Sequence, residues 1–205
     1  MNMSLVDIIY DLPANPKTIC LRELFGNDRP IELEIGTGKG GFLLQQARAH
    51  EDRNYLGIEW ANKYFKLAAD RMARWGVGNV RMIRCDAKVF VQQCLPAASI
   101  CALHVHHPDP WPKRRHHRRR LFDEAFVDAA AKALVDGGVL DVQTDHAEYF
   151  EQIRSVLRAQ PDLEETLFAR QNQDECDDVI ATNFQIKYQR EGREIYRLTY
   201  RRRPR

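Results

Sequence analysis

The segment IELEIGTGKGG, residues 31–41, determines how the rest of the chain is interpreted. Its first five residues alternate aliphatic side chains with glutamate, which is typical of a strand, and four glycines follow within six positions. Gly36, Gly38 and Gly41 fit the pattern G-x-G-x-x-G, and a predicted helix over 40–49 follows. A strand, a glycine turn and a helix in this order begin the α/β folds that bind nucleotide-like ligands.

Short apolar runs continue to alternate with amphipathic segments along most of the chain. We expect strands at 31–36, 54–60, 79–85, 99–107 and 138–144, and helices at 40–49, 61–75, 87–95, 122–135 and 146–159. The helix over 122–135 should stop at Asp136-Gly137-Gly138. This alternation predicts a single-domain, Rossmann-like α/β fold, with a mostly parallel sheet and helices on both faces. Two strand-like runs, 162–170 and 193–201, flank a polar loop and predict a C-terminal antiparallel hairpin.

Length and composition indicate one globular domain. The chain has 205 residues, of which 44% are hydrophobic and 29% are charged. We expect residues 1–29 to be an N-terminal extension and residues 30–205 to be the functional domain. No apolar run approaches the ~18 residues of a membrane helix, and the first residues lack the features of a signal peptide, so we expect no membrane association. Five cysteines without a C-x-x-C pair favour a reducing, cytoplasmic location.

Basic charge is concentrated in two short stretches. Residues 113–120 hold six Lys and Arg, residues 201–205 hold four, and neither stretch contains an acid. Without these ten, 21 basic residues remain against 29 acidic ones, although the whole chain has a formal net charge of +2. A charge run is often only a solvated surface, but against an acidic remainder a phosphate-binding patch is the better interpretation.

Three acids stand at the carboxyl ends of the first three predicted strands, where ligands bind in open α/β sheets: Glu34, Glu59 and Asp86. The glycine pattern alone would fit a nicotinamide-dependent oxidoreductase equally well, or a tight turn without a ligand. However, Glu34 beside the turn would repel a pyrophosphate and attract a cationic ligand. An acid-lined glycine turn therefore favours S-adenosylmethionine, which carries a sulfonium and an ammonium group but no phosphate.

The segment HHPDPWPKRRHHRRR, residues 106–120, holds one acid at the start of the basic run. Pro108 and Pro110 restrict the backbone around Asp109 and remove two donors, so the position of this carboxylate should be rigid. The segment fits either a turn acid followed by a solvated loop or a fixed acid beside a polyanion-binding arm. Trp111 could stack on a base or anchor the loop, and the sequence favours neither.

Six segments, in this order, carry a resemblance to a known family. They are LEIGTGKG (33–40), GIEW (57–60), NVRMIRCDA (79–87), PDPWPKRRHHRRR (108–120), GGVLDVQTD (137–145) and TNFQIKYQREG (182–192). Together they resemble the bacterial tRNA (guanine-N7)-methyltransferases, which modify a guanine in the tRNA variable loop. The match covers roughly residues 30–200, and PDPW-P-K with the basic run is its most specific part.

The resemblance implies a class I methyltransferase domain over 30–205 that uses S-adenosylmethionine and binds tRNA. It implies cofactor contacts from the glycine turn and the acids, with Asp109 also the catalytic residue: Glu34, Gly36, Gly38, Glu59, Asp86 and Asp109. It implies contacts to the substrate guanosine from Lys113, Asp145, Thr182 and Gln185. The basic run would contact RNA phosphates through Arg114, Arg115, Arg118, Arg119 and Arg120.

The sequence departs from the family pattern at two places. His106-His107 stand where the family usually has aromatic residues, and Gln185 stands where it usually has glutamate. Both departures leave open the alternative that the chain is a methyltransferase-like RNA-binding protein with an altered substrate or lost turnover. Thr182 and Gln185 also fit a helix capping box that needs no ligand.

The histidines of the fourth predicted strand raise the question of a metal. In H-x-H-H, His104 and His106 point to one face of the strand and His107 to the other. Because no cysteine or acid stands at a matching spacing, we expect no metal site.

Overall fold

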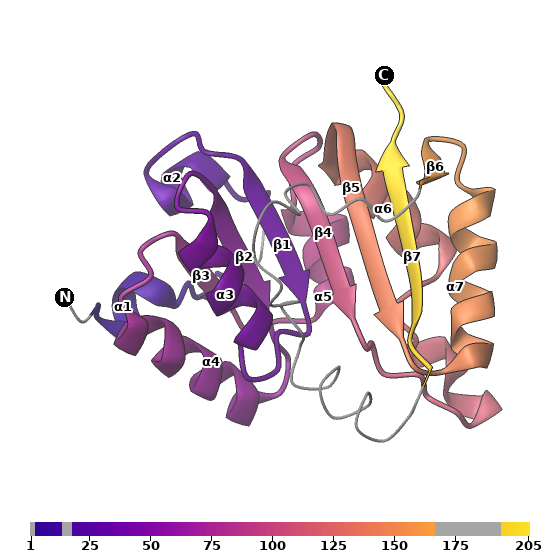
Figure 1. Cartoon of the computed structure of the whole chain (residues 1–205), viewed down its shortest axis with the longest axis horizontal. Coiled ribbons are helices and arrows are strands. Elements are labelled where there is room, and N and C mark those ends of the chain that lie inside the picture. The colour runs from indigo at the N-terminus through magenta and orange to yellow at the C-terminus, as the bar shows by residue number, and fades with distance from the viewer. Residues whose placement is uncertain (1–2, 14–17, 167–193) are drawn as a thin grey trace.

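The computed structural model describes residues 3–13, 18–166 and 194–205, and Figure 1 shows a central sheet with helices on both sides. The strands are β1 (Ile31–Ile35), β2 (Asn54–Ile58), β3 (Val80–Ile83), β4 (Ile100–His106), β5 (Leu134–Thr144), β6 (Leu163–Thr166) and β7 (Tyr196–Arg202). The α-helices are α1 (Leu5–Ile8), α2 (Leu21–Phe25), α3 (Gly41–Ala49), α4 (Asn62–Trp75), α5 (Ala87–Val89), α6 (Glu124–Ala133) and α7 (Ala147–Ala159). A π-helical turn, η1 (Phe90–Cys94), and a 3-10 helix, η2 (Arg114–Arg119), complete the described elements.

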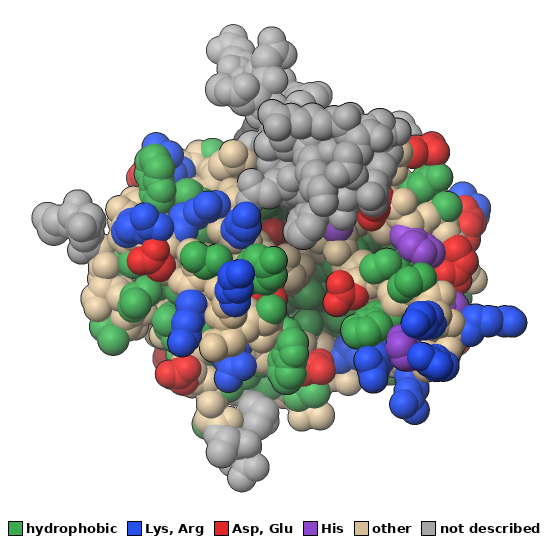
Figure 2. Space-filling model, turned by 90° about the horizontal axis from the view of Figure 1, so that it is seen from below, with side chains coloured by type: hydrophobic (Ala, Val, Ile, Leu, Met, Phe, Trp, Pro, Cys, Tyr) green, Lys and Arg blue, Asp and Glu red, His purple; other side chains and the backbone are tan. Residues whose placement is uncertain are grey.

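The strand order confirms the predicted fold class. The sheet runs β3-β2-β1-β4-β5-β7-β6, and β7 pairs antiparallel with both β5 and β6 while the other pairs are parallel. The chain therefore moves outward from β1 to β3 and then crosses back to β4 beside β1. The point between β1 and β4 is where ligands bind in such sheets, beyond the carboxyl ends of the strands. The carboxyl ends of the parallel strands, such as β1, β4 and β5, point downward in Figure 1 and face the viewer of Figure 2.

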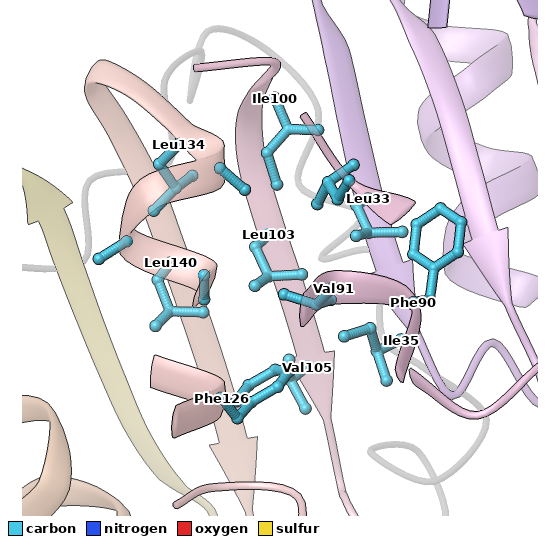
Figure 3. Close-up of a cluster of buried hydrophobic side chains, with 14 of the residues drawn as sticks. Leu33, Ile35, Phe90, Val91, Ile100, Leu103, Val105, Phe126, Leu134 and Leu140 are labelled. Carbon is cyan, nitrogen blue, oxygen red and sulfur yellow. The ribbon is translucent and has the colours of Figure 1, made fainter. Parts of the chain in front are cut away.

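Two apolar clusters hold the helices to the sheet. On one face, Leu33, Leu103 and Leu140 pack with Phe90 and Phe126 from η1 and α6, and all five are fully buried (Figure 3). A second cluster joins α1, α3 and α4 to β2 and β3; its members include Ile8, Leu43, Phe65, Met72 and Met82. Burial of apolar area of this kind supplies most of the driving force for folding.

The largest error in the predicted boundaries is at the start of β5. The predicted stop at Asp136-Gly137-Gly138 is wrong, because α6 ends at Ala133 and β5 already begins at Leu134. The pairing of β4 with β5 shifts register between Ile100 and Ala102, and Gly137 takes a left-handed conformation (φ 77°). The two glycines thus allow an irregular, exposed stretch inside a strand.

The N-terminal extension packs against the domain where it is described. Ile8 is fully buried, and the amide of Tyr10 donates to the carbonyl of Met82 at 2.9 Å, which places this segment beside β3. Leu21 and Phe25 belong to the larger apolar cluster. The division of the chain at residue 30 stays a prediction. Among the described residues, we find no helix with the length and apolar character that crossing a bilayer requires.

Candidate active site at the carboxyl edge of the sheet

The predicted acids are all found at or near the carboxyl edge. Glu34 lies on β1, Glu59 directly follows β2, and Asp86 comes shortly after β3. Asp109 and Asp145 follow β4 and β5. Strands that are distant in sequence therefore bring five carboxylates to one side of the molecule, the side that Figure 2 shows.

The glycine turn after β1 is open on one side and bound to Glu59 on the other. Gly36 (φ 77°) and Gly38 (φ 53°) have left-handed backbones, and a Cβ atom placed on either would meet no atom of the described residues within 4 Å. The buried carboxylate of Glu59 accepts hydrogen bonds from the amides of Gly38 and Ala61, each at 2.8 Å. The turn is thus held by β2 and leaves room for a ligand to approach its backbone.

Glu34 is a buried carboxylate with an unused acceptor. Its side chain is 4% exposed, and its Oε2 atom finds no hydrogen-bond partner in the described part of the chain. Burial raises the pKa of Glu34 to about 8, and the nearby charge of Glu59 adds to the shift while His104 opposes it. A buried, unpartnered carboxylate oxygen costs free energy unless a donor or a cation satisfies it, so the site favours such a ligand.

Asp86 is exposed and caps the helix that follows it. Its Oδ1 atom accepts from the amide of Lys88 at 2.8 Å and from the amide of Val89 at 3.2 Å. This cap fixes the carboxylate near the end of β3, and its contact with a ligand stays a prediction.

The turn that carries Asp109 has an unusual backbone. His107 (φ 53°) and Trp111 (φ 44°) both adopt left-handed conformations, which are uncommon for residues other than glycine, and exposed Asp109 lies between them. The Trp111 ring contacts the guanidinium of Arg119 at 4.9 Å and the ring of His116 at 5.8 Å. In this structure Trp111 therefore anchors the basic helix to the turn.

The basic run forms η2, and most of its cations point to solvent. The predicted phosphate contacts Arg114, Arg115, Arg118 and Arg119 are exposed, as is Lys113 at the start of the helix. In Figure 2, Lys and Arg side chains gather with histidines on the right-hand side of this face.

Arg120 does not fit the prediction that it contacts phosphate. Its side chain is 2% exposed, and its Nη1 donates to Glu148 Oε1 at 3.0 Å. Its Nε donates to the carbonyl of Pro110 at 2.8 Å, and Gln152 accepts a further hydrogen bond. Because its donors are used inside the protein, Arg120 holds the turn of Asp109 against α7 and is not available to a phosphate.

The predicted guanosine contacts are described only in part. Asp145 is half-buried, and its Oδ1 lies 3.7 Å from His107 Nδ1, which connects the end of β5 to the PDPW turn. Thr182 and Gln185, with the capping box predicted for them, lie outside the described residues, as does the polar loop predicted between the two strands of the hairpin.

A group of polar residues, of which His104 is half-buried and the other three are buried, was not predicted; we call it the sheet-face cluster, and it consists of Glu32, His104, His106 and Asp141. His104 Nε2 lies 2.9 Å from Glu32 Oε2, and His106 Nε2 lies 3.0 Å from Asp141 Oδ2. Burial lowers the pKa of His106, whereas the hydrogen bond to Glu32 and the charges of Glu32 and Asp141 overcome burial and raise the pKa of His104 to about 10. The signal in the sequence was the alternation of polar residues in IELEI, LHVHH and LDVQT.

Comparison with known proteins finds similarity to methyltransferases over most of the chain. A family model described as "Putative methyltransferase" matches residues 28–198. The tRNA (guanine-N(7)-)-methyltransferase of Alkalilimnicola ehrlichii is 37% identical over 191 residues, which are 93% of this chain and 80% of that protein. The protein of the same name from Geobacter metallireducens is 32% identical over 178 residues, 87% of this chain and 84% of its own.

A solved structure supports the fold. The antibiotic-resistance methyltransferase Kmr superposes with a TM-score of 0.61 at 18% identity, over 95% of this chain and 98% of its own. Identity this low carries information on the fold alone. The identities to the curated relatives, over most of both chains, establish more: the chain belongs to the family of the tRNA (guanine-N(7)-)-methyltransferases.

Proposed function

We propose that this protein transfers a methyl group from S-adenosylmethionine to N7 of a guanine in the variable loop of tRNA. The observation that carries the proposal is that one edge of the sheet combines an acid-lined glycine turn, the proline-flanked turn of Asp109 and the exposed basic helix η2. The first two suit a cationic ligand, and the third suits a polyanion. This combination agrees with the names of the relatives.

The residues at the edge fit S-adenosylmethionine. The open side of Gly36 and Gly38 gives space at the backbone, and the unpartnered Oε2 of Glu34 offers an acceptor in a buried position. We expect Glu34, Glu59, Asp86 and Asp109 to hold the ligand. S-adenosylmethionine supplies an electrophilic methyl group on a sulfonium. The carboxylates at this edge favour bound positive charge and would repel the negatively charged pyrophosphate of a dinucleotide.

The chain needs no nucleophile for this reaction. Guanine N7 carries an in-plane lone pair, so no general base has to remove a proton first. The task of the protein is to hold the base in line at close range, which alone can account for much of the rate. Asp109 and Asp145 can accept from the N–H groups of the base and offset the positive charge that develops on the purine. Lys113, and Thr182 with Gln185, complete the proposed guanosine contacts.

The basic helix η2 would bind the tRNA backbone. Arg114, Arg115, Arg118 and Arg119 are exposed next to the PDPW turn, so phosphates held there would bring an adjacent base toward Asp109. Folded tRNA is recognised largely through shape and phosphates, which such a patch can contact without reading sequence. We also place the protein in the cytoplasm, where tRNA is modified and where the free cysteines Cys20, Cys85, Cys94 and Cys101 would stay reduced.

Incubation of the protein with radiolabelled S-adenosylmethionine and bulk tRNA lacking 7-methylguanosine tests the proposal. We expect label in tRNA, in 7-methylguanosine, at a position in the variable loop. Label at another base or position would refute the proposed specificity. Binding of tRNA without any transfer would favour an RNA-binding protein that has lost turnover, the alternative that His106, His107 and Gln185 leave open.

A further inference from the structure

The sheet-face cluster brings side chains of the kinds that bind metals together from neighbouring strands, with His104 half-buried and the others buried. His104 pairs with Asp141 in the register of β4 and β5, and His106 follows two residues later on the same face of β4. His106 and Asp141 are 8% and 6% exposed. The proposed methyl transfer uses none of these three side chains. The proposed reaction therefore does not account for the presence of these polar side chains inside the protein.

The spacing of the three side chains is that of a metal site. His106 Nε2 and His104 Nδ1 lie 3.0 and 3.8 Å from the same atom, Asp141 Oδ2, and one ligand atom from each residue lies within 4.8 Å of the others. Around a tetrahedral zinc ion with bonds of about 2.0–2.1 Å, ligand atoms are separated by roughly 3.3–3.4 Å. We propose that His104, His106 and Asp141 bind a zinc ion, with the fourth position left to water.

The surroundings of His104 resemble those of histidines that bind metals. Such a histidine usually gives its second nitrogen to a carboxylate, which fixes the ring and its tautomer. Here His104 Nε2 contacts Glu32 Oε2 at 2.9 Å, and Glu32 Oε1 accepts from Arg53 Nη1 at 2.6 Å. This leaves His104 Nδ1 free to face the metal position, where it finds no hydrogen-bond partner in the described residues.

The remaining atoms also favour a bound cation. Asp141 Oδ1 is buried and finds no hydrogen-bond partner among the described residues, so this carboxylate has an acceptor to spare for a cation. A zinc ion bound there would offset the negative charge of the neighbouring Glu32 and Asp141 carboxylates. It would join β4 to β5 on the face opposite the apolar core, with Glu32 connecting β1.

Metal titration of the full chain tests the site independently of methyl transfer. Protein made without a polyhistidine tag and dialysed against a chelator is titrated with Zn²⁺ in competition with a chromophoric chelator, and separately with Co²⁺. We expect one Zn²⁺ per chain, a higher melting temperature with Zn²⁺, and the visible absorption of tetrahedral Co²⁺. His106→Phe and Asp141→Asn should abolish all three, and Glu32→Gln should weaken Zn²⁺ binding by about 10–100-fold.

Two control variants remove histidines elsewhere. His50→Asn changes the residue after α3, and His116→Asn/His117→Asn changes the basic helix η2; both should bind Zn²⁺ as the wild type does. The proposal is wrong if the wild type binds no Zn²⁺, or if binding persists in His106→Phe and Asp141→Asn. If circular dichroism shows that these two variants do not fold, ¹⁵N NMR of the zinc-loaded wild type decides. His104 must then bind through Nδ1 and His106 through Nε2, and any other pattern overturns the site.

Discussion

The two faces of the central strands are both buried but have opposite chemistry. On β1, β4 and β5, Leu33, Leu103 and Leu140 face the larger apolar cluster and are fully buried. The neighbouring residues Glu32, His104 and Asp141 face the other way and form ion pairs across the strands. Apolar packing is non-directional and tolerates similar shapes, whereas each buried charge needs a particular partner. The apolar face therefore contributes most to the stability of the fold. The polar face and the adjoining carboxyl edge instead select particular partners, within the protein and among ligands.

The apolar face should give the largest single effect on stability. Leu103→Ala removes a fully buried side chain from the centre of the sheet, and we expect the free energy of unfolding to fall by about 2–5 kcal/mol. Leu5→Ala, at a position that is 46% exposed, should change it by less than about 0.5 kcal/mol. Denaturant unfolding of both variants measures the difference. Equal effects would mean that this face is not the core.

A substitution in the glycine turn should weaken ligand binding while the protein still folds. Gly38→Val places a β-branched side chain at φ 53° and fills the open space beside the turn. We expect the affinity for S-adenosylmethionine to fall about 100-fold or more. This corresponds to a loss of about 2.8 kcal/mol of binding free energy, at about 1.4 kcal/mol for each factor of ten. Calorimetric titration measures this, with Gly38→Ala as the milder variant. The wild type should not bind NADH; tight NADH binding without S-adenosylmethionine binding would overturn the cofactor assignment.

The basic run contains both kinds of arginine, because Arg120 is buried and Arg118 is exposed. Arg120→Lys cannot reproduce the contacts of the guanidinium with Glu148, Gln152 and the carbonyl of Pro110, and we expect a loss of about 1–3 kcal/mol in stability. Arg118→Lys, two residues earlier and exposed, should leave stability unchanged. Thermal unfolding of the two variants compares them directly. A stable Arg120→Lys protein with weakened tRNA binding would restore Arg120 to the phosphate contacts.

The exposed cations should give the smallest effect, visible mainly in salt dependence. In Arg114→Ala/Arg118→Ala, the slope of log affinity for tRNA against log salt should flatten by roughly 1.4–1.8, about 0.7–0.9 for each cation. S-adenosylmethionine binding should be unchanged. Arg22→Ala/Arg29→Ala, at exposed positions before β1, is the matched control and should keep the wild-type slope. An unchanged slope in the first variant would mean that η2 does not contact phosphates.

Local patterns were sufficient to predict the fold and most of the candidate edge. Strand and helix periodicity gave the α/β class, and the rule that ligands bind at the carboxyl ends of strands placed Glu34, Glu59 and Asp86 together. These inferences need only the order of elements along the chain. The early start of β5 was missed because Gly137 and Gly138 allow a bulge as readily as a helix stop.

Pairings between distant segments could not be predicted in the same way. The burial of Arg120 depends on Glu148, 28 residues later, and on how α7 packs. The sheet-face cluster depends on the register that sets His104 opposite Asp141. We expected no metal site because no cysteine or acid stands at a matching spacing, whereas Asp141, the acid of the proposed zinc site, lies on the neighbouring strand β5.

The central claim is that the carboxyl edge performs methyl transfer while η2 binds tRNA, and Asp109→Asn tests it most directly. This change keeps the size of the side chain and removes its charge. With saturating S-adenosylmethionine, the single-turnover rate of tRNA methylation should fall by on the order of 10²–10³, the range for loss of one preorganised electrostatic group. The affinity for tRNA should change little, and the exposed control Asp52→Asn should match the wild type in both. A rate for Asp109→Asn within about threefold of the wild type would contradict the claim, because the range above could not then apply to this carboxylate.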